Sequence, residues 1–80
     1  MKNDLSSTAV IYAILSINSE ISLQKEYLES SDIDPDERDN EEDILEDLEQ
    51  AFMEFIELYK IYLRADSKLP SIDELLNSEL

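Results

Sequence analysis

Apolar residues recur in the first third of the chain at alternating four- and three-residue steps. The series consists of Val10, Ile14, Ile17, Ile21 and Leu28, with Gln24 as its one polar member. Residues at this spacing share one face of an α-helix and form a seam against a partner helix. Ser6 or Ser7 stands where a side-chain oxygen accepts from the free amides of a first helical turn. The pattern therefore predicts a helix over residues 6–29.

The same stepping returns in the second half of the chain and predicts a helix over residues 40–65. Its main seam consists of Leu45, Leu48, Phe52, Phe55, Tyr59 and Tyr62. A second apolar stripe, with Ile56 and Leu63 among its members, widens this surface, so the helix must contact more than one neighbour. Two seams of similar length joined by a short polar segment predict an antiparallel helical hairpin. We assign Phe52, Phe55, Tyr59 and Tyr62 to the core and to a dimer contact.

Residues 30–39 form the expected acidic connection between the two helices. Pro35 has no amide to donate and disfavours helical geometry at Asp34. Proline is also well suited to the first position of a helix, with Asp34 as the cap. The second helix can therefore start as early as Pro35 or as late as Asn40.

A short third helix is expected over residues 71–79, after Pro70. Ser71 and Glu74 have the spacing of a capping box, and an apolar face follows them. This helix is expected to fold back near Tyr12 and Tyr59. Glycine, which serves tight hairpin turns, is absent from the chain. These features predict a single all-α domain over residues 1–80.

The length of 80 residues limits how far one chain can bury its own apolar surface. A chain of this size buries about 60–65% of the surface that its unfolded form exposes. With no cysteine in the sequence, disulfides and thiolate metal sites cannot add stability. We therefore expect the hairpin to dimerise into a four-helix bundle.

Negative charge is concentrated in the middle of the sequence. The net charge is −15, and residues 29–50 hold twelve carboxylates and one arginine. Such a surface repels nucleic acid and anionic membranes and attracts basic proteins. No stretch approaches the ~20 apolar residues that span a bilayer. We expect a cytoplasmic protein whose partner is a protein with a basic surface, with no direct nucleic-acid or membrane contact. Acidity that serves only solubility is the alternative.

Residues suited to catalysis near neutral pH are scarce. Histidine and cysteine are absent, and without glycine no glycine-rich phosphate loop can form. The carboxylates lie in a polar run with no apolar pocket to separate their pKa values. We expect neither an enzyme nor a bound cofactor.

A weak calcium-loop pattern occupies residues 32–43. Asp32, Asp34 and Asp36 alternate as in the opening of an EF-hand loop, and Asp43 takes its twelfth position. The sharp turn of such a loop needs glycine where this chain has Glu37, and Pro35 falls inside the ligand run. A divalent-metal-responsive module built on these residues is an alternative function.

Six carboxylates of the second helix form the acidic face that we assign to partner binding. They are Asp39, Glu42, Asp43, Glu46, Asp47 and Glu49. At three- and four-residue spacing their side chains lie on the order of 6 Å apart, comparable with successive phosphates of a nucleic-acid strand. The pattern favours a regulator, inhibitor or immunity-type protein that binds a basic partner surface, and imitation of nucleic acid is one mode of binding that this spacing allows. An ordinary solvated helix face is one alternative, and a structural subunit that docks a heteropartner through its apolar stripe is another.

Tyrosines stand at four positions that have the spacing of core residues. They are Tyr12, Tyr27, Tyr59 and Tyr62. We expect these rings to be buried with their hydroxyls at the rim, and we prefer this interpretation to a surface on which bases stack.

Overall fold

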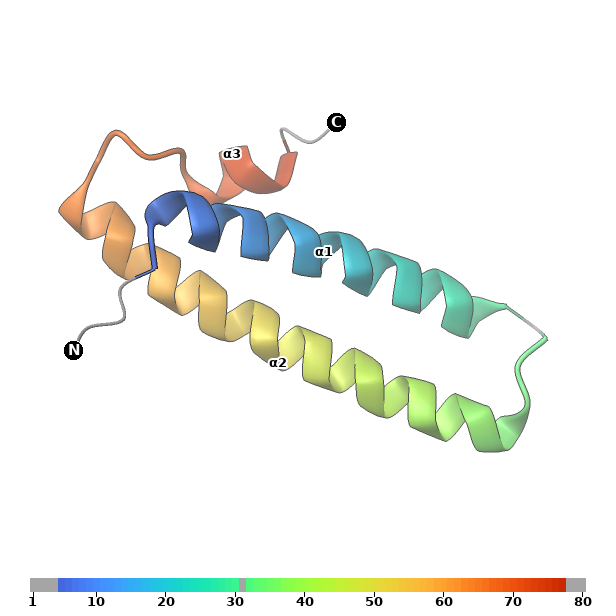
Figure 1. Cartoon of the computed structure of the whole chain (residues 1–80). Coiled ribbons are helices and arrows are strands. Elements are labelled where there is room, and N and C mark those ends of the chain that lie inside the picture. The colour runs from blue at the N-terminus through green and yellow to red at the C-terminus, as the bar shows by residue number, and fades with distance from the viewer. Residues whose placement is uncertain (1–4, 31, 78–80) are drawn as a thin grey trace.

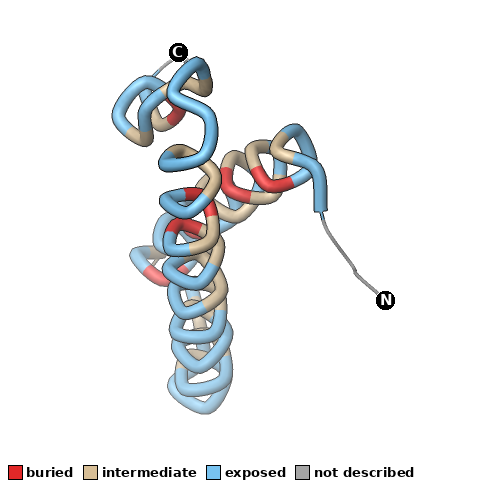
Figure 2. The backbone as a smooth tube through the Cα atoms, turned by 90° about the vertical axis from the view of Figure 1, so that its left-hand side faces the viewer, coloured by how far each residue is buried: buried red, intermediate tan, exposed pale blue. Residues whose placement is uncertain are grey.

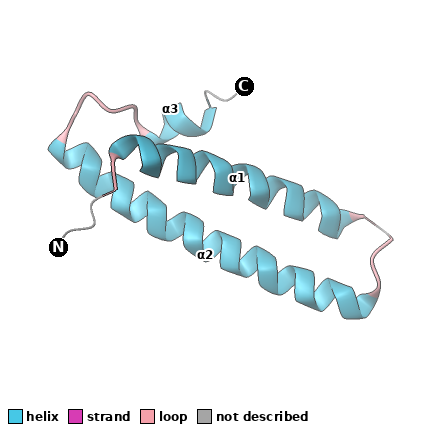
Figure 3. Cartoon of the chain, in the orientation of Figure 1, coloured by secondary structure: helices cyan, strands magenta, loops and turns pink. Residues whose placement is uncertain are grey.

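The structure, a computed structural model, describes residues 5–30 and 32–77. Its three helices are α1 (Ser7–Glu29), α2 (Pro35–Ala65) and α3 (Ile72–Asn77). Helices α1 and α2 run side by side in opposite directions, and α3 lies beside the N-terminal half of α1 (Figure 1). The described residues contain no strand (Figure 3). The predicted all-α hairpin with a short third helix is confirmed, while residues 78 and 79 of the predicted third helix lie outside the described residues.

Helix α1 follows the predicted cap and seam closely. The Ser6 Oγ accepts a hydrogen bond from the Ala9 amide at 3.0 Å. Seam residues Val10, Ile14, Ile21 and Leu28 are buried. The hydrophobic effect therefore fixes one face of α1, and the serine satisfies an amide that its first turn leaves free.

Helix α2 takes the earlier of the two starts that the sequence allows. Pro35 is its first residue and Asp34 precedes it in extended conformation. The proline loses nothing here, because an amide at the first helical position has no partner within the helix. Asp36 and Glu37 then occupy the first turn, where the helix dipole favours negative charge. The acidic connection is correspondingly shorter than residues 30–39.

Helix α3 begins with the predicted capping box. The Glu74 amide donates to Ser71 Oγ at 3.1 Å, and the Ser71 amide donates to Glu74 Oε1 at 2.8 Å. Tyr59 fixes the preceding segment, because its hydroxyl donates to the Pro70 carbonyl at 2.6 Å. The third helix was also expected to fold back near Tyr12, and this expectation is wrong, because Tyr12 is 64% exposed. Its position lies off the α1 seam, on a side of the helix that α3 does not cover.

The main core lies at the end where all three helices meet, called here the three-helix end. Its buried residues are Val10, Ile14, Ile56, Tyr59 and Leu75, of which Val10, Ile14 and Tyr59 have no exposed surface. Figure 2 shows buried segments from different helices gathered at this end, while the far half of α2 is largely exposed. The only buried residues that the structure describes outside this group are Ile21 and Leu28. Apolar packing therefore holds one end of the hairpin and thins toward the other.

The molecule is elongated and flat for its length. Its radius of gyration is 15.2 Å and its extents are 46 × 34 × 14 Å. A compact domain of this length has a radius of gyration of about 12 Å. The accessible surface is 5862 Å², against about 5000 Å² for a compact monomer of this mass. The hairpin thus encloses less of itself than a globular domain does, and the expected dimer stays a prediction.

No helix in the described part of the chain, α1 and α2 included, has the length and hydropathy needed to cross a bilayer.

Replacing Tyr59 by phenylalanine is expected to change stability in a pH-dependent way. Burial raises the pKa of Tyr59 above its ordinary value, with smaller effects from Glu74 and Asp66. A raised pKa means that folding favours the neutral hydroxyl, so its contribution is complete below pH 10.0 and is lost as pH rises through the folded-state pKa. At neutral pH the variant loses one hydrogen bond, about 1 kcal/mol.

Urea unfolding between neutral and alkaline pH checks this expectation. The difference between wild type and Tyr59→Phe should shrink as the pH passes the folded-state pKa. Tyr12→Phe is the control, because its hydroxyl makes no hydrogen bond to another described residue. A difference that stays constant into alkaline solution would contradict the assignment of the buried hydroxyl.

Candidate protein-interaction face

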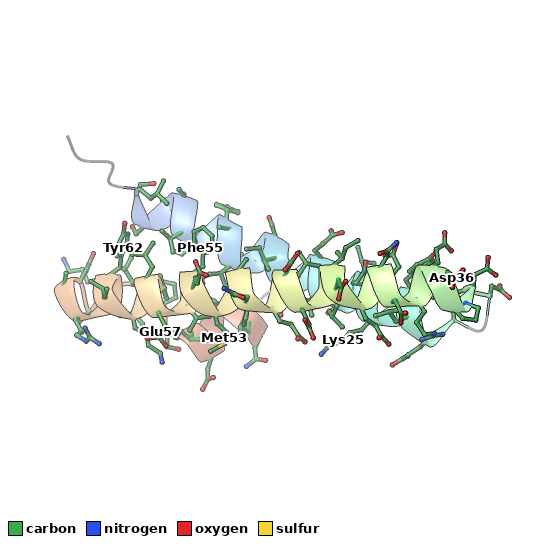
Figure 4. All side chains as sticks on the ribbon, turned by 90° about the horizontal axis from the view of Figure 1, so that it is seen from below. Lys25, Asp36, Met53, Phe55, Glu57 and Tyr62 are labelled. Carbon is green, nitrogen blue, oxygen red and sulfur yellow. The ribbon has the colours of Figure 1, made fainter. Side chains whose placement is uncertain are left out.

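The acidic face lies on the N-terminal half of α2, and all six of its residues are exposed. Asp39, Glu42, Asp43, Glu46, Asp47 and Glu49 lie within eleven consecutive positions, roughly 15 Å of helix. Figure 4 shows side chains projecting from both sides of this half of α2, from Asp36 onward. Among the described residues, Glu49 alone of the six has a charged partner, Lys25. The structure therefore leaves all six predicted residues exposed on the same half of α2, spread over nearly half of the helix circumference.

Arg38 anchors this half of α2 to the end of α1. Its Nη1 donates to the Leu28 carbonyl at 2.7 Å, and its Nη2 donates to the Ser30 carbonyl at 3.4 Å. Carbonyls at the end of an α-helix have no partner within that helix, so the guanidinium satisfies groups that would otherwise depend on water. Arg38 is also the one cation among the twelve carboxylates of residues 29–50. It is committed to the backbone of α1 and does not neutralise the acidic face.

Gln24 makes the second polar connection between the helices. Its Nε2 donates to the carbonyl of Glu41 at 3.0 Å and to Glu41 Oε1 at 2.6 Å. This contact explains why a glutamine occupies a seam position and why Glu41, which is half-buried, does not belong to the acidic face. The Lys25–Glu49 pair, at 4.0 Å between two half-exposed side chains, adds little stability. Polar contacts thus add to the sparse apolar packing at the acidic end.

The pKa of Tyr27 is affected by the carboxylates at this end of the hairpin. Glu37 raises the pKa of Tyr27 above its ordinary value, with smaller contributions from desolvation, Glu41 and Asp34. Tyr27 is 43% exposed, so its predicted burial is wrong. It lies beside the seam and faces solvent next to the first turns of α2.

The four weak metal candidates are not gathered into a site. Asp32 and Asp34 precede α2, whereas Asp36 and Asp43 lie within it, about 10 Å apart along the axis. Because residues 35–43 are helical, they do not wrap around a central ion as an EF-hand loop does. Over residues 5–30 and 32–77, no three potential ligands stand close enough to hold a metal ion.

The four residues assigned to core and dimer all lie in the core of a single chain. Tyr59 is fully buried, and Phe52, Phe55 and Tyr62 are half-buried against the same group. The Tyr62 hydroxyl donates to the Leu5 carbonyl, which ties the segment before α1 to the end of α2. All four residues thus lie in or against the core of a single chain, and their role in a dimer stays a prediction.

Two exposed apolar side chains on α1 were not among the predicted site residues. Leu23 is 58% exposed and Tyr12 is 64% exposed, and both lie on the side of α1 that faces neither α2 nor α3. The sequence held one signal that these residues are exposed, since neither of them belongs to the seam. Tyr12 also lies in a stretch, from Leu5 to Ser19, that contains no charged residue.

Comparison with known proteins leaves the function open. No protein-family model, no curated protein and no solved structure matches this chain.

Proposed function

We propose that the chain is a protein–protein interaction module that binds a basic protein surface through its acidic face. The observation that carries the proposal is the exposure of all six carboxylates, five of which have no charged partner among the described residues. Carboxylates left in this state create a potential that accelerates and orients association with a cationic surface. A regulator, an inhibitor or an immunity-type protein acts in this way. Self-association of the hairpin is the second part of the proposal.

The spacing of the acidic face favours a nucleic-acid-binding partner. Residues three and four positions apart on a helix hold their side chains on the order of 6 Å from one another, close to the separation of successive phosphates. A cleft lined by lysine and arginine for a phosphate backbone can accept such a row. The polar contacts of Arg38 and Gln24 support this mode of binding, because they hold the acidic half of α2 against α1 before any partner arrives.

Charge reversal on the acidic face tests the proposal. A variant that carries Glu42→Lys, Asp43→Lys and Glu46→Lys is expected to lose partner capture from native lysate while keeping its helical circular dichroism. The physical reason is that three attractive contacts become repulsive in a largely electrostatic interface. For the wild type, retention should fall steeply with added salt, since exposed charges are screened within about 10 Å at 0.1 M. Added duplex DNA should displace a partner whose nucleic-acid cleft is occupied.

The matched control reverses three exposed carboxylates away from the acidic face, Glu26, Glu57 and Asp73. It has the same net charge as the first variant, so a general effect of charge would weaken both equally. Capture that survives reversal of the acidic face, or that is lost equally in the control, would reject the proposal.

A further inference from the structure

One face of α1 is covered by neither of the other helices. It consists of Tyr12, Ser16, Ser19, Glu20, Leu23 and Tyr27, which are all exposed and which we call the α1 stripe. At 3.6 residues per turn they fall within an arc of roughly 100°. Seam residues such as Val10 are buried between the helices, and Ile11 and Leu15 pack against the buried residues of the three-helix end. Three large side chains of the α1 stripe, Tyr12, Leu23 and Tyr27, therefore keep about half or more of their surface exposed in a single chain.

We propose that the α1 stripe packs against the α1 stripe of a second copy, with the two α1 helices antiparallel. The inference rests on the self-association in the proposed function and names its face and orientation. Tyr12 is 64% exposed, Leu23 is 58% exposed and Tyr27 is 43% exposed. Exposed large apolar side chains that share one face of a helix mark a candidate association surface.

Charge selects a second copy as the occupant. The chain has a net charge of −15, yet Leu5 to Ser19 contains no charged residue and the α1 stripe contains only Glu20. Two copies that meet acidic end to acidic end place carboxylates against carboxylates, whereas at the α1 stripe they bring together mainly tyrosine, serine and leucine. The α1 stripe has one carboxylate and the acidic face has six, so a basic partner is attracted more strongly to the acidic face. The stripe thus offers a copy of this chain its least repulsive approach.

The order of residues along the α1 stripe is matched to an antiparallel two-fold axis. With that axis between Ser19 and Glu20, Tyr12 meets Tyr27 of the partner, and Ser16 meets the partner's Leu23. In a symmetric dimer each such contact occurs twice. The small Ser16 leaves room for the large leucine, and the two tyrosines can stack at each end. The pattern therefore complements itself in this register.

The distribution of charge also favours the antiparallel orientation. Residues 29–50 hold a net charge of −11, and a parallel pair would set two such segments side by side. In the antiparallel register the centres of the two segments move roughly 20 Å apart along the helices, about two Debye lengths at physiological salt. Glu20 is then the one acidic group held near its own copy across the axis.

The size of the α1 stripe sets the expected strength of the dimer. The sixteen residues from Tyr12 to Tyr27 offer a strip of roughly 23 Å by 10 Å, below the ~800 Å² per partner of a standard interface. Ile44 of α2, which is 44% exposed, is apolar surface on the neighbouring helix that can widen the contact. We expect a reversible dimer with a dissociation constant in the micromolar to sub-millimolar range.

Sedimentation velocity on the full chain, from about 10 µM to about 1 mM in about 0.5 M salt, tests the interface. The wild type should shift from monomer to dimer, and Leu23→Glu should remain a monomer because it buries a charge against a second copy. Met53→Glu is the matched control: Met53 is 55% exposed and projects from α2 on the side where α3 lies (Figure 4). Glu20→Gln should tighten the dimer by about two- to fivefold.

Cysteine cross-linking tests the register, since the chain has no cysteine of its own. Ser19→Cys stands beside the proposed axis, so two copies should form a disulfide on oxidation. Ser16→Cys lies about 10 Å along the axis from its equivalent and should not. In a parallel dimer both variants would cross-link, and that result would overturn the antiparallel arrangement.

Two further outcomes would overturn the interface itself. The first is a wild type that stays monomeric up to about 1 mM. That result would reject a second copy as the partner of the α1 stripe. The second is a dimer that Leu23→Glu and Met53→Glu weaken equally. Reversing the charges of the acidic face leaves the α1 stripe unchanged, so that variant should still dimerise. Failure of partner capture and failure of dimerisation are therefore separate results.

Discussion

Replacing Ile14 by alanine is expected to lower the free energy of unfolding by about 2–5 kcal/mol. Ile14 has no exposed surface and lies at the three-helix end, where α1 packs with residues of α2 and α3. The truncation removes buried methyl and methylene groups and leaves a cavity that rigid helices fill only in part. A domain of this length has a total stability of about 4–12 kcal/mol, so the variant should be close to unfolding. Urea unfolding followed by far-ultraviolet circular dichroism at one fixed concentration measures the difference.

The control for this truncation is Ile61→Ala, in which the same atoms are removed from α2. Ile61 is 54% exposed, so its loss should change stability by less than about 0.5 kcal/mol. If the two variants were equally destabilised, apolar burial at the three-helix end would not be the main source of stability. If Ile14→Ala were nearly neutral, the group around Tyr59 could not be the core.

The helices and their facing sides could be predicted because they depend on local periodicity. Val10, Ile14, Ile21 and Leu28 are buried as their spacing indicates, and the Ser71–Glu74 capping box forms as written in the sequence. A 3.6-residue period determines which side of a helix is apolar, whatever the rest of the fold does. The exposure of the acidic face followed from the same spacing, since its carboxylates lie away from the seam.

Features that depend on the placement of one helix against another could not be predicted. The side of α1 that α3 covers decides whether Tyr12 is buried, and nothing in the local sequence determines that side. Both Tyr12 and Tyr27 are exposed, contrary to their expected burial. The hydrogen bonds of Gln24 could not be predicted either, because its partner Glu41 lies on the other helix of the hairpin. The sequence did not determine whether α2 starts at Pro35 or as late as Asn40, since Pro35 is compatible with both a connection and a first helical turn.

These features imply a gradient of stability along the hairpin. The three-helix end has most of the enclosed apolar side chains, whereas the acidic end has Ile21, Leu28 and a few polar contacts. Regions with few buried apolar contacts open at lower free energy than the whole domain does. The acidic face therefore lies on the less stable half of the molecule. A few hydrogen bonds, among them those of Gln24 and Arg38, hold this half in a fixed position.

Replacing Arg38 by methionine is expected to lower the free energy of unfolding by about 1.5–3 kcal/mol. The variant loses the hydrogen bonds from the guanidinium to the Leu28 and Ser30 carbonyls, and leaves residues 29–50 without a cation. Arg38→Lys keeps the charge but lacks the planar fork that reaches two carbonyls, so it should recover less than half of the loss. Urea unfolding measures the total effect. Amide hydrogen exchange in the last turn of α1 and the first turns of α2 should show where protection is lost.

Salt separates the two contributions of Arg38. Added salt at about 1 M shortens the screening length to about 3 Å and suppresses repulsion among the carboxylates, while the hydrogen bonds to the carbonyls remain. The deficit of Arg38→Met should therefore persist at high salt, and amides at the three-helix end should exchange as in the wild type. A deficit that disappears in salt, together with full recovery by Arg38→Lys, would mean that Arg38 acts as a counter-charge. The acidic half of α2 would then be held against α1 by Gln24 and apolar contacts, with no anchor at the end of α1.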